Sequence, residues 1–291
     1  MKKLLFLSLF LSIAIGGYSQ EKTSIDKFKL VKFDDANFNR ATDDATNFNN
    51  PVNMARSIDL LSPTETLLGT TWYDLFSNYN TGNRFWRFED GTMAAVWMLG
   101  FQATAFPDRG TAYNYYNGSN WGSAPTTRIE SIRCGWPNIT AWGTAGEIGV
   151  SHNGVAGLEF IRRSTKGSGT WTQTNFLGPT GIENVITWPR LIASGNDNEY
   201  THVIASTNGP WQGQTTTIVY SRSDNGGTTW NPHNIVIPEL NENHYREITQ
   251  DKYVFASNGN TVCILYIDAY TDLFYLRSDD NGTTLTRNIV W

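Results

Sequence analysis

Short runs of strand-forming residues alternate with clusters of Gly, Asn and Asp along most of this chain, from about residue 66 onward. Runs such as RFWRFEDGTMAAVWM, THVIAST, TTTIVYSRS and DLFYLRS each hold four to eight residues with β propensity, bounded by turn-forming residues. Beyond the N-terminus, no stretch repeats its apolar positions with the period of a helix. The pattern therefore predicts an all-β chain with many short strands.

One phrase occurs twice in nearly the same form. Residues 222–230 read RSDNGGTTW and residues 277–285 read RSDDNGTTL, while STKGSGTW at 164–171 and NYYNGSNW at 114–121 are weaker copies. The closing Trp or Leu falls at positions 121, 171, 230 and 285, so the intervals are 50, 59 and 55 residues. A repeat of this length that contains several short strands is typical of a propeller blade.

Each repeat lies between two predicted strands, so its residues have the roles that a tight turn requires. A short carboxylate or amide accepts hydrogen bonds from backbone N–H groups, Gly supplies a positive φ, and hydroxyls satisfy further backbone groups. The closing Trp packs between neighbouring sheets. In the two best copies these structural residues are Ser223, Asn225, Gly227, Thr229 and Trp230, and Ser278, Asp280, Gly282 and Thr284. Lys166 cannot act as a cap, so we expect the second turn to be looser.

The repeats resemble the Asp box of the sialidase-like (BNR-repeat) β-propellers, over about residues 80–291. The resemblance implies a sialidase-like propeller of four-stranded blades, with four blades over about 83–130, 136–180, 186–238 and 245–291. Propellers of this family usually have six blades, which requires roughly 330 residues. We therefore expect an incomplete ring with missing C-terminal blades, and a closed four-bladed ring is the alternative.

The N-terminus indicates export. The first twenty residues, MKKLLFLSLFLSIAIGGYSQ, have two lysines followed by an apolar run and small residues, which is typical of a bacterial signal peptide (1–20). The apolar run is short for a transmembrane span, and no later segment is long enough for one. Residues 21–65 predict an irregular leader and residues 66–291 the blades. We expect a secreted or cell-surface protein.

Charge and cysteine content exclude several functions. The formal net charge is −5, and loss of Lys2 and Lys3 with the signal moves it to about −7, which argues against nucleic acid as a partner. Cys134 and Cys263, in a chain with four His, form no metal framework, and they are either one disulfide or two separate thiols. Phosphate-binding loops, HExxH and GxSxG are absent, so we expect no metal and no cofactor.

The resemblance implies that the chemistry lies away from the Asp boxes, which sit at the outer rim in this family. An exo-sialidase clamps the substrate carboxylate with three arginines, and it uses an acid/base carboxyl and a Tyr nucleophile activated by Glu. Arg84 takes the place of the first-blade arginine, Asp108 that of the acid/base, and Arg190, in WPRL, begins the third inner strand. The alternatives are a surface arginine at Arg84 and a polar turn at Asp108.

The phrase NHYREI precedes the fourth blade and supplies Tyr245, Arg246 and Glu247, the residue types of the nucleophile, the clamp and the activating carboxylate. Ordinary salt bridging between blades is the alternative, because the family takes its nucleophile from a later blade. The alignment of the blades also places Tyr253, and not Arg246, opposite Arg190.

Two functions fit the sequence. The first is an exported propeller that binds or acts on glycans or glycoproteins, with exo-α-sialidase (glycoside hydrolase) activity as its sharpest form. The second is a non-catalytic propeller that binds proteins at the cell surface. For this chain alone we expect no turnover, because the blades that carry the nucleophile are missing from it.

Overall fold

The computed structural model describes residues 65–73, 75, 82–249, 252–267 and 273–290. All of these residues belong to one compact unit, Pro63–Trp291. The expected signal peptide, and the expected leader up to residue 64, lie outside the described residues. In the part of the chain that is described, no helix has the length and apolarity that crossing a membrane requires.

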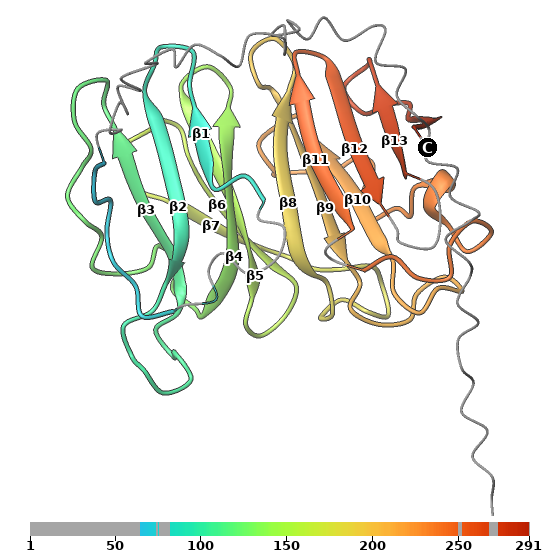
Figure 1. Ribbon diagram of the computed structural model, residues 1–291, viewed down its shortest axis with the longest axis horizontal. Helices are drawn as coiled ribbons and strands as arrows, with labels where there is room; N and C mark the ends of the chain where they lie inside the picture. The colour runs from blue at the N-terminus through green and yellow to red at the C-terminus, as the bar shows by residue number, and fades with distance from the viewer. Residues whose placement is uncertain (1–64, 74, 76–81, 250–251, 268–272, 291) are drawn as a thin grey trace, which may run out of the picture. The chain divides into compact units, whose positions relative to one another are not determined.

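Four antiparallel sheets follow one another along the chain, and each is a meander in which consecutive strands pair (Figure 1). The first holds β1 (Phe85–Arg87), β2 (Met93–Leu99) and β3 (Gly110–Tyr116). The second holds β4 (Cys134–Trp142), β5 (Gly146–Asn153), β6 (Leu158–Arg163) and β7 (Thr172–Phe176). The third holds β8 (Thr187–Ser194), β9 (Tyr200–Ser206) and β10 (Ile218–Ser223). After the 3-10 turn η4 (Pro238–Leu240), the fourth holds β11 (Tyr253–Asn258), β12 (Thr261–Ile267), β13 (Leu273–Ser278) and β14 (Thr286–Ile289).

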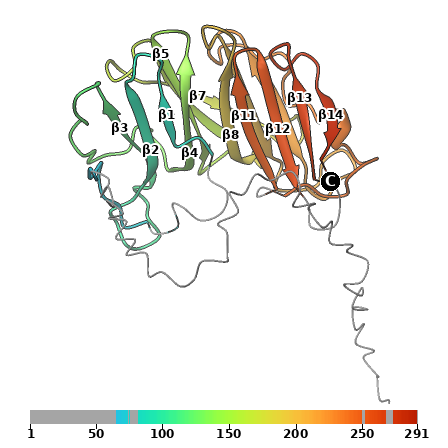
Figure 2. The same ribbon diagram turned by 45° about the horizontal axis from the view of Figure 1, so that its top comes forward.

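The first strands of the sheets lie beside one another, β1 against β4, β4 against β8 and β8 against β11, and the other strands extend away from them (Figure 2). Meander sheets placed side by side in this way are the blades of a β-propeller. The predicted all-β class and the propeller fold are therefore confirmed. Among the described residues, the strands of the first and fourth sheets do not pack against each other as those of neighbouring sheets do, and the two sheets lie at opposite ends of the series in Figure 2, so the described blades do not close a ring.

The first and third sheets have three strands, and a single β-bridge stands in place of the expected fourth strand. The stretch expected at 121–130 contributes only the pair Tyr116↔Trp121, and the third sheet gains only Tyr220↔Ile235. Pro125 and Pro232 follow the closing tryptophans of these repeats, and proline has no N–H to donate to a strand ladder. The outer edge of each of these sheets is therefore irregular.

The hydrophobic core lies between successive sheets, so strands in the middle of the series are covered on both faces. Eight consecutive residues of β4, from Cys134 to Ala141, are buried. Separate clusters fill the space between the first and second, second and third, and third and fourth sheets. Cys134 and Cys263 are free thiols in different sheets, which decides between the two alternatives for this pair.

The third repeat turn (223–230) is held by its own side chains. Ser223 Oγ accepts the N–H of Gly227 at 2.8 Å, and Asn225 Oδ1 accepts the N–H of Thr229 at 2.9 Å. Gly227 has a φ of 78°, a conformation that costs glycine little. These are the roles that the repeated phrase predicts for a serine, an amide and a glycine at these positions.

The fourth repeat turn (278–285) repeats the same bonds. Ser278 Oγ accepts the N–H of Gly282 at 2.7 Å, and Asp280 Oδ1 accepts the N–H of Thr284 at 2.9 Å. The backbone hydrogen bond from Thr284 is the main cause that lowers the pKa of Asp280 to about 2. Asn225 and Asp280 therefore have the same role, since an amide oxygen and a carboxylate oxygen both accept a backbone hydrogen bond.

The second repeat turn (164–171) receives its carboxylate from a neighbouring strand. Lys166 turns away to pair with Asp90 at 2.7 Å, and the N–H of Gly167 donates to Glu147 Oε1 at 3.1 Å. Glu147 lies on β5 and is fully buried, with the Arg163 Nε 2.5 Å away. The cap that the local sequence lacks is thus supplied across the sheet.

Trp230 closes the third repeat turn, and its truncation tests the role of the repeats. Its ring centroid lies 5.0 Å from those of Phe160 and Phe176 in the second sheet, and the side chain is half-buried. We expect Trp230→Ala to lower the free energy of unfolding by about 2–3 kcal/mol, below the cost of a fully buried tryptophan. Urea unfolding measures the loss, with Trp72→Ala, 64% exposed, as the control. An unchanged midpoint for Trp230→Ala would contradict a packing role.

Candidate functional site

The strand directions separate the predicted site from the repeat turns. β1 and β2 are antiparallel, with Phe85 paired with Ala95 and Arg87 with Met93, so β1 begins on the side toward which β2 runs. The β2–β3 loop therefore lies at the end where the inner strands begin, at the lower edge of Figure 1, and the turns after the third strands lie at the opposite edge. We name these the arginine end (around Arg84, Asn138 and Arg190) and the turn end (around the repeat turns).

Two inner strands open with the same bulge. In β4 the register shifts between Gly135 and Asn138, and in β8 between Thr187 and Arg190. Trp136 and Trp188 at these bulges have φ values of 56° and 49°, a conformation that a bulky side chain rarely adopts. A bulge re-aims the side chains that follow it, here Asn138 and Arg190.

Arg84 and Arg190 converge at the arginine end. Burial, and then the charge of Arg190, lower the pKa of Arg84 to about 10. The Nε and Nη2 atoms of Arg84 are buried, and no acceptor among the described residues binds them. Buried donors without acceptors are costly and rare in folded proteins, so this place favours an acceptor that the described residues do not supply.

Asn138 and Arg190 both bind backbone carbonyls at this end. Asn138 Nδ2 donates to the carbonyls of Trp136 and Pro189 at 3.1 and 3.0 Å. Arg190 Nη1 donates to the Pro189 carbonyl at 3.1 Å, and its guanidinium lies 5.4 Å from the centre of the Tyr253 ring. The predicted alignment of Tyr253 with Arg190 agrees with this contact.

Asp108 lies at the same end, in the β2–β3 loop. Its Oδ2 accepts the N–H of Phe101 at 2.6 Å and its Oδ1 accepts that of Gln102 at 3.2 Å. The half-buried carboxylate therefore fixes the loop. It also borders a hollow of about 580 Å³ whose wall includes Arg128.

The remaining predicted residues lie elsewhere. Tyr245 is buried between the third and fourth sheets, with its ring 5.7 Å from that of Phe274, and it accepts a bond from Arg287 Nη2 at 3.0 Å. Arg246 and Glu247 are exposed, and their backbone pairs with the segment before β10. The structure thus brings Arg84 and Arg190 together and places these three residues along the third strands, away from the inner ones.

A buried polar cluster that the sequence did not reveal lies beneath the arginine end. Arg109 donates to the Cys134 carbonyl at 3.0 Å, and its Nη2 lies 3.4 Å from His152 Nε2. Thr187 Oγ1 lies 3.0 Å from His152 Nδ1. Burial, followed by the charge of Arg109, lowers the pKa of His152 to about 3. These partners are distant in sequence, so no local pattern could have shown the cluster.

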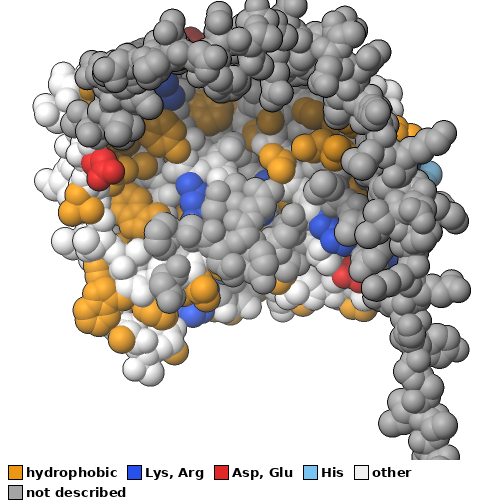
Figure 3. Space-filling view, in the orientation of Figure 1, with side chains coloured by type: hydrophobic (Ala, Val, Ile, Leu, Met, Phe, Trp, Pro, Cys, Tyr) orange, Lys and Arg blue, Asp and Glu red, His pale blue; other side chains and the backbone are white. Residues whose placement is uncertain are grey.

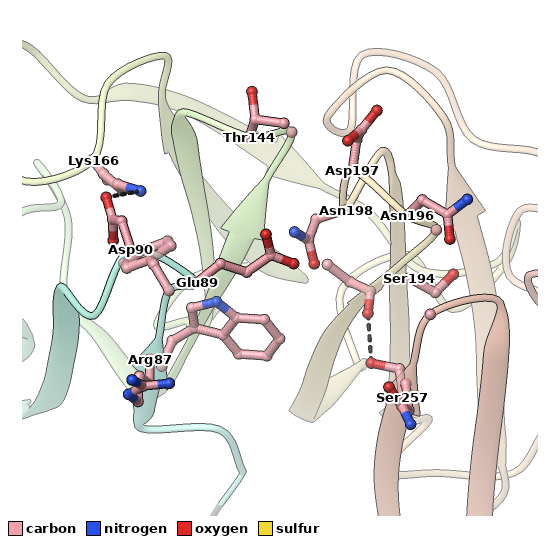
Figure 4. Close-up of a pocket in the computed structure, with 17 residues that line it drawn as sticks. Arg87, Glu89, Asp90, Thr144, Lys166, Ser194, Asn196, Asp197, Asn198 and Ser257 are labelled. Carbon is pink, nitrogen blue, oxygen red and sulfur yellow. Dashed lines mark hydrogen bonds and ion pairs between the residues drawn. The ribbon is translucent and has the colours of Figure 1, made fainter.

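A hollow of about 720 Å³ lies at the turn end, where connections after the inner strands meet. Figure 4 shows Asp90 paired with Lys166 on one side, and Asn196, Asp197 and Asn198 on the other. Its lining carries the carboxylates of Glu89, Asp90 and Asp197 and the cations of Arg87 and Lys166, so it offers an anion no excess of positive charge. Among the described residues no group of three or more His, Cys, Asp or Glu side chains is placed to hold a metal ion.

Comparisons with known proteins concern the fold. No family model and no curated protein matches the chain. Similar solved structures include a Hadza microbial sialidase (16% identity, 62% of this chain and 33% of that one, TM-score 0.39) and the fucose-specific lectin from Aleuria aurantia (12%, 70% and 59%, 0.44). A third is the catalytic domain of a Coprinopsis cinerea GH62 α-L-arabinofuranosidase (11%, 76% and 71%, 0.45).

This chain spans about a third of the sialidase and about three fifths of the lectin. Sialidases are among the similar structures, as the sequence resemblance implies. At these TM-scores the likenesses carry no argument about the site, and the propeller arrangement rests on the sheets themselves.

Proposed function

We propose that this chain is an exported propeller that binds glycans through an acidic sugar, with the sugar carboxylate held at the arginine end. The observation that carries the proposal is Arg84, whose buried Nε and Nη2 have no acceptor among the described residues. A guanidinium presents its donors as a planar fork that matches a carboxylate. Burial, and then repulsion by Arg190, lower the pKa of Arg84, and a bound anion would offset that repulsion.

Sialic acid is the sugar that we propose, because its carboxylate sits on the ring and its hydroxyls suit amide partners. Asn138 Oδ1 is buried and accepts no hydrogen bond from a described residue. In this proposal Arg84 supplies a cation before β1 and Asn138 supplies an acceptor on β4. A sialylated glycoprotein at the cell surface would present this group to an exported protein.

Binding without hydrolysis is the form of the function that we favour. Tyr245 is packed against Phe274 and bonded to Arg287, and Glu247 pairs with Thr216 before the third strand β10, so neither lies beside the inner-strand arginines Arg84 and Arg190. Asp108 does belong to it, which keeps exo-α-sialidase activity as the second candidate. That candidate needs a nucleophile other than Tyr245.

Arg84→Ala is expected to weaken sialyllactose binding at least tenfold, because a charge-assisted hydrogen bond contributes about 1.5–3 kcal/mol. Titration calorimetry with sialyllactose, and with lactose as the neutral matched ligand, measures the effect. Arg87→Ala is the control, since Arg87 is exposed at the far end of β1. Equal affinity for the two sugars, or an unaffected Arg84→Ala protein, would refute the proposal.

A fluorogenic sialoside separates the two candidate functions. We expect the purified chain to show no turnover while it binds sialyllactose. Turnover that Asp108→Asn abolishes would establish the hydrolase instead, because the amide keeps one oxygen for the loop but cannot transfer a proton. Export is tested separately, by fractionation of a bacterial host and sequencing of the mature N-terminus.

A further inference from the structure

The chain enters β1 through Gly82, Asn83 and Arg84, which we call the entry segment. β1 has only three residues, and it is an edge strand of the first sheet, where it pairs with β2. The Arg84 carbonyl accepts the N–H of Val96 at 2.8 Å, which extends this pairing by one residue. Because the strand is so short, the position of the Arg84 side chain depends on the groups that hold the entry segment.

Asn83 bonds the entry segment to the inner strands of the next two sheets. Its carbonyl accepts the N–H of Ile139 on β4 at 2.7 Å. Its Nδ2 donates to the Leu191 carbonyl on β8 at 2.8 Å, across 108 residues of sequence. Ile139 follows Asn138, and Leu191 follows Arg190, so each bond ends one residue from a side chain of the arginine end. One half-buried asparagine thus connects three sheets at this end.

Gly82 lies directly against two side chains of the arginine end. A Cβ added to Gly82 would collide with Asn138 Oδ1 and would lie 3.1 Å from Arg190 Cδ. Asn138 Nδ2 in turn donates to the Pro189 carbonyl at 3.0 Å, which joins β4 to β8. The entry segment is therefore held against β4 and β8 by packing as well as by hydrogen bonds. A shift of this segment would displace Asn138 and Arg190 together.

The charges at this end oppose the arrangement that the bonds maintain. Figure 3 shows Lys and Arg side chains on the face of the molecule that carries the inner strands. Burial, and then the charge of Arg190, lower the pKa of Arg84. Like charges that are close together repel, so the strands that carry them need a restraint. A neutral amide suits this role, because a carboxylate at position 83 would cancel part of the positive charge that an anionic ligand requires.

We infer that Asn83 is a positioning residue, which holds Arg84 and Arg190 at the spacing that one carboxylate requires. It acts through the backbone, on Arg84 as the next residue and on Arg190 through Leu191. Arginine forks bind a carboxylate best when their donors are already aimed at it, because pre-organised groups lose less freedom on binding. The acidic sugar as ligand rests on the function proposed above, whereas the restraint on the two arginines does not depend on it.

Nitrogen-15 spectra of the arginine Nε–H groups test the restraint without a ligand. We expect Asn83→Ala to shift the signal of Arg190, which an Arg190→Lys variant assigns. The Arg190 signal is decisive, since Arg84 would sense the substitution as a sequence neighbour. Asn175→Ala is the matched control, because Asn175 Nδ2 also donates to backbone carbonyls, at 3.0 and 3.1 Å, but on the edge strand β7. An unmoved Arg190 signal in Asn83→Ala would overturn the inference.

Calorimetry with sialyllactose tests the consequence for binding. Asn83→Ala should weaken binding about three- to tenfold, the range expected for the net loss of one hydrogen bond, while Asn175→Ala should bind like the unaltered chain. Arg84→Ala and the double variant Asn83→Ala with Arg84→Ala should bind equally, because the spacing of two arginines has no effect once one is missing. A general loss of structure would instead weaken binding in both backgrounds alike.

The results separate this inference from the function on which it builds. If Arg84→Ala leaves the sialyllactose affinity unchanged, the proposed function fails, and the Arg190 signal alone decides the positioning role. If Arg84→Ala weakens binding and Asn83→Ala does not, the positioning role is wrong and the proposed function stands. Additive losses in the double variant would overturn the positioning role too. Circular dichroism and urea midpoints show whether each variant is folded.

Discussion

Glu147→Ala is expected to lower the free energy of unfolding by about 3–5 kcal/mol, the cost of removing one partner from a buried ion pair. Glu147 is fully buried and accepts bonds from Arg163 Nε at 2.5 Å, the Tyr113 hydroxyl at 2.9 Å and the Gly167 N–H at 3.1 Å. Burial raises the pKa of this carboxyl, and Arg163 opposes that rise. Without the carboxylate, the Arg163 cation stays buried and the second repeat turn loses its cap.

Urea unfolding followed by tryptophan fluorescence measures the loss. Asp90→Asn is the control, because Asp90 pairs with Lys166 at the surface, where an ion pair contributes less than about 1 kcal/mol. The double variant Glu147→Leu with Arg163→Met should recover much of the stability, since it leaves no buried charge. If Glu147→Ala and Asp90→Asn lower the free energy of unfolding equally, the buried ion pair does not stabilise the fold more than the surface pair does.

Acid is expected to destabilise the third and fourth sheets through His202. The ring is fully buried, with Ser194 Oγ 2.7 Å from Nε2 and the Tyr220 hydroxyl 2.8 Å from Nδ1. Burial, and then Arg222, lower its pKa from 6.5 to about 3. A base with a depressed folded pKa takes up its proton first in the unfolded chain. The free energy of unfolding therefore decreases as pH falls from about 6.5 toward 3.

The expected slope is about 1.4 kcal/mol per pH unit for this histidine, so the loss near pH 4.5 is about 2–3 kcal/mol. Urea midpoints between pH 7 and 4 should fall less steeply for His202→Gln than for the unaltered chain. His152→Gln should show a similar flattening, because the pKa of His152 is lowered in the same way. His244→Gln, at an exposed site, should follow the unaltered curve, and parallel curves for all four proteins would exclude the buried-histidine mechanism.

Local signals in the sequence predicted the fold well. The strands follow from short apolar runs, and the third and fourth repeat turns follow from Ser, Asn or Asp, and Gly at fixed spacing. The features that local patterns could not show depend on partners far along the chain. Glu147 caps a turn twenty residues away, and the bulges at Trp136 and Trp188 are visible only when the inner strands pair.

The candidate site was predictable only in part, for a similar reason. Arg84 and Arg190 begin inner strands, and such starts meet at one end of a propeller, so strand order alone brings them together. Tyr245, Arg246 and Glu247 were chosen by residue type in one phrase. Type does not say on which strand a residue will pack, and Tyr245 faces Phe274 in the core. The roles of these three residues, like that of Asp108, remain predictions.

The hydrogen bonds that Arg162 and Arg222 make to the next repeat turn bear on how such repeats diverge over time. Arg162 and Arg222 bind a backbone carbonyl of the next turn, and every amino acid provides a backbone carbonyl. A turn can therefore exchange Gly226 for Asn281 without losing the main-chain contact, provided that its backbone keeps the positive φ found at both positions. Selection would then act on the backbone conformation of the turn more than on its amino-acid sequence. Repeat copies with little sequence similarity to the others can still keep the contact between neighbouring sheets.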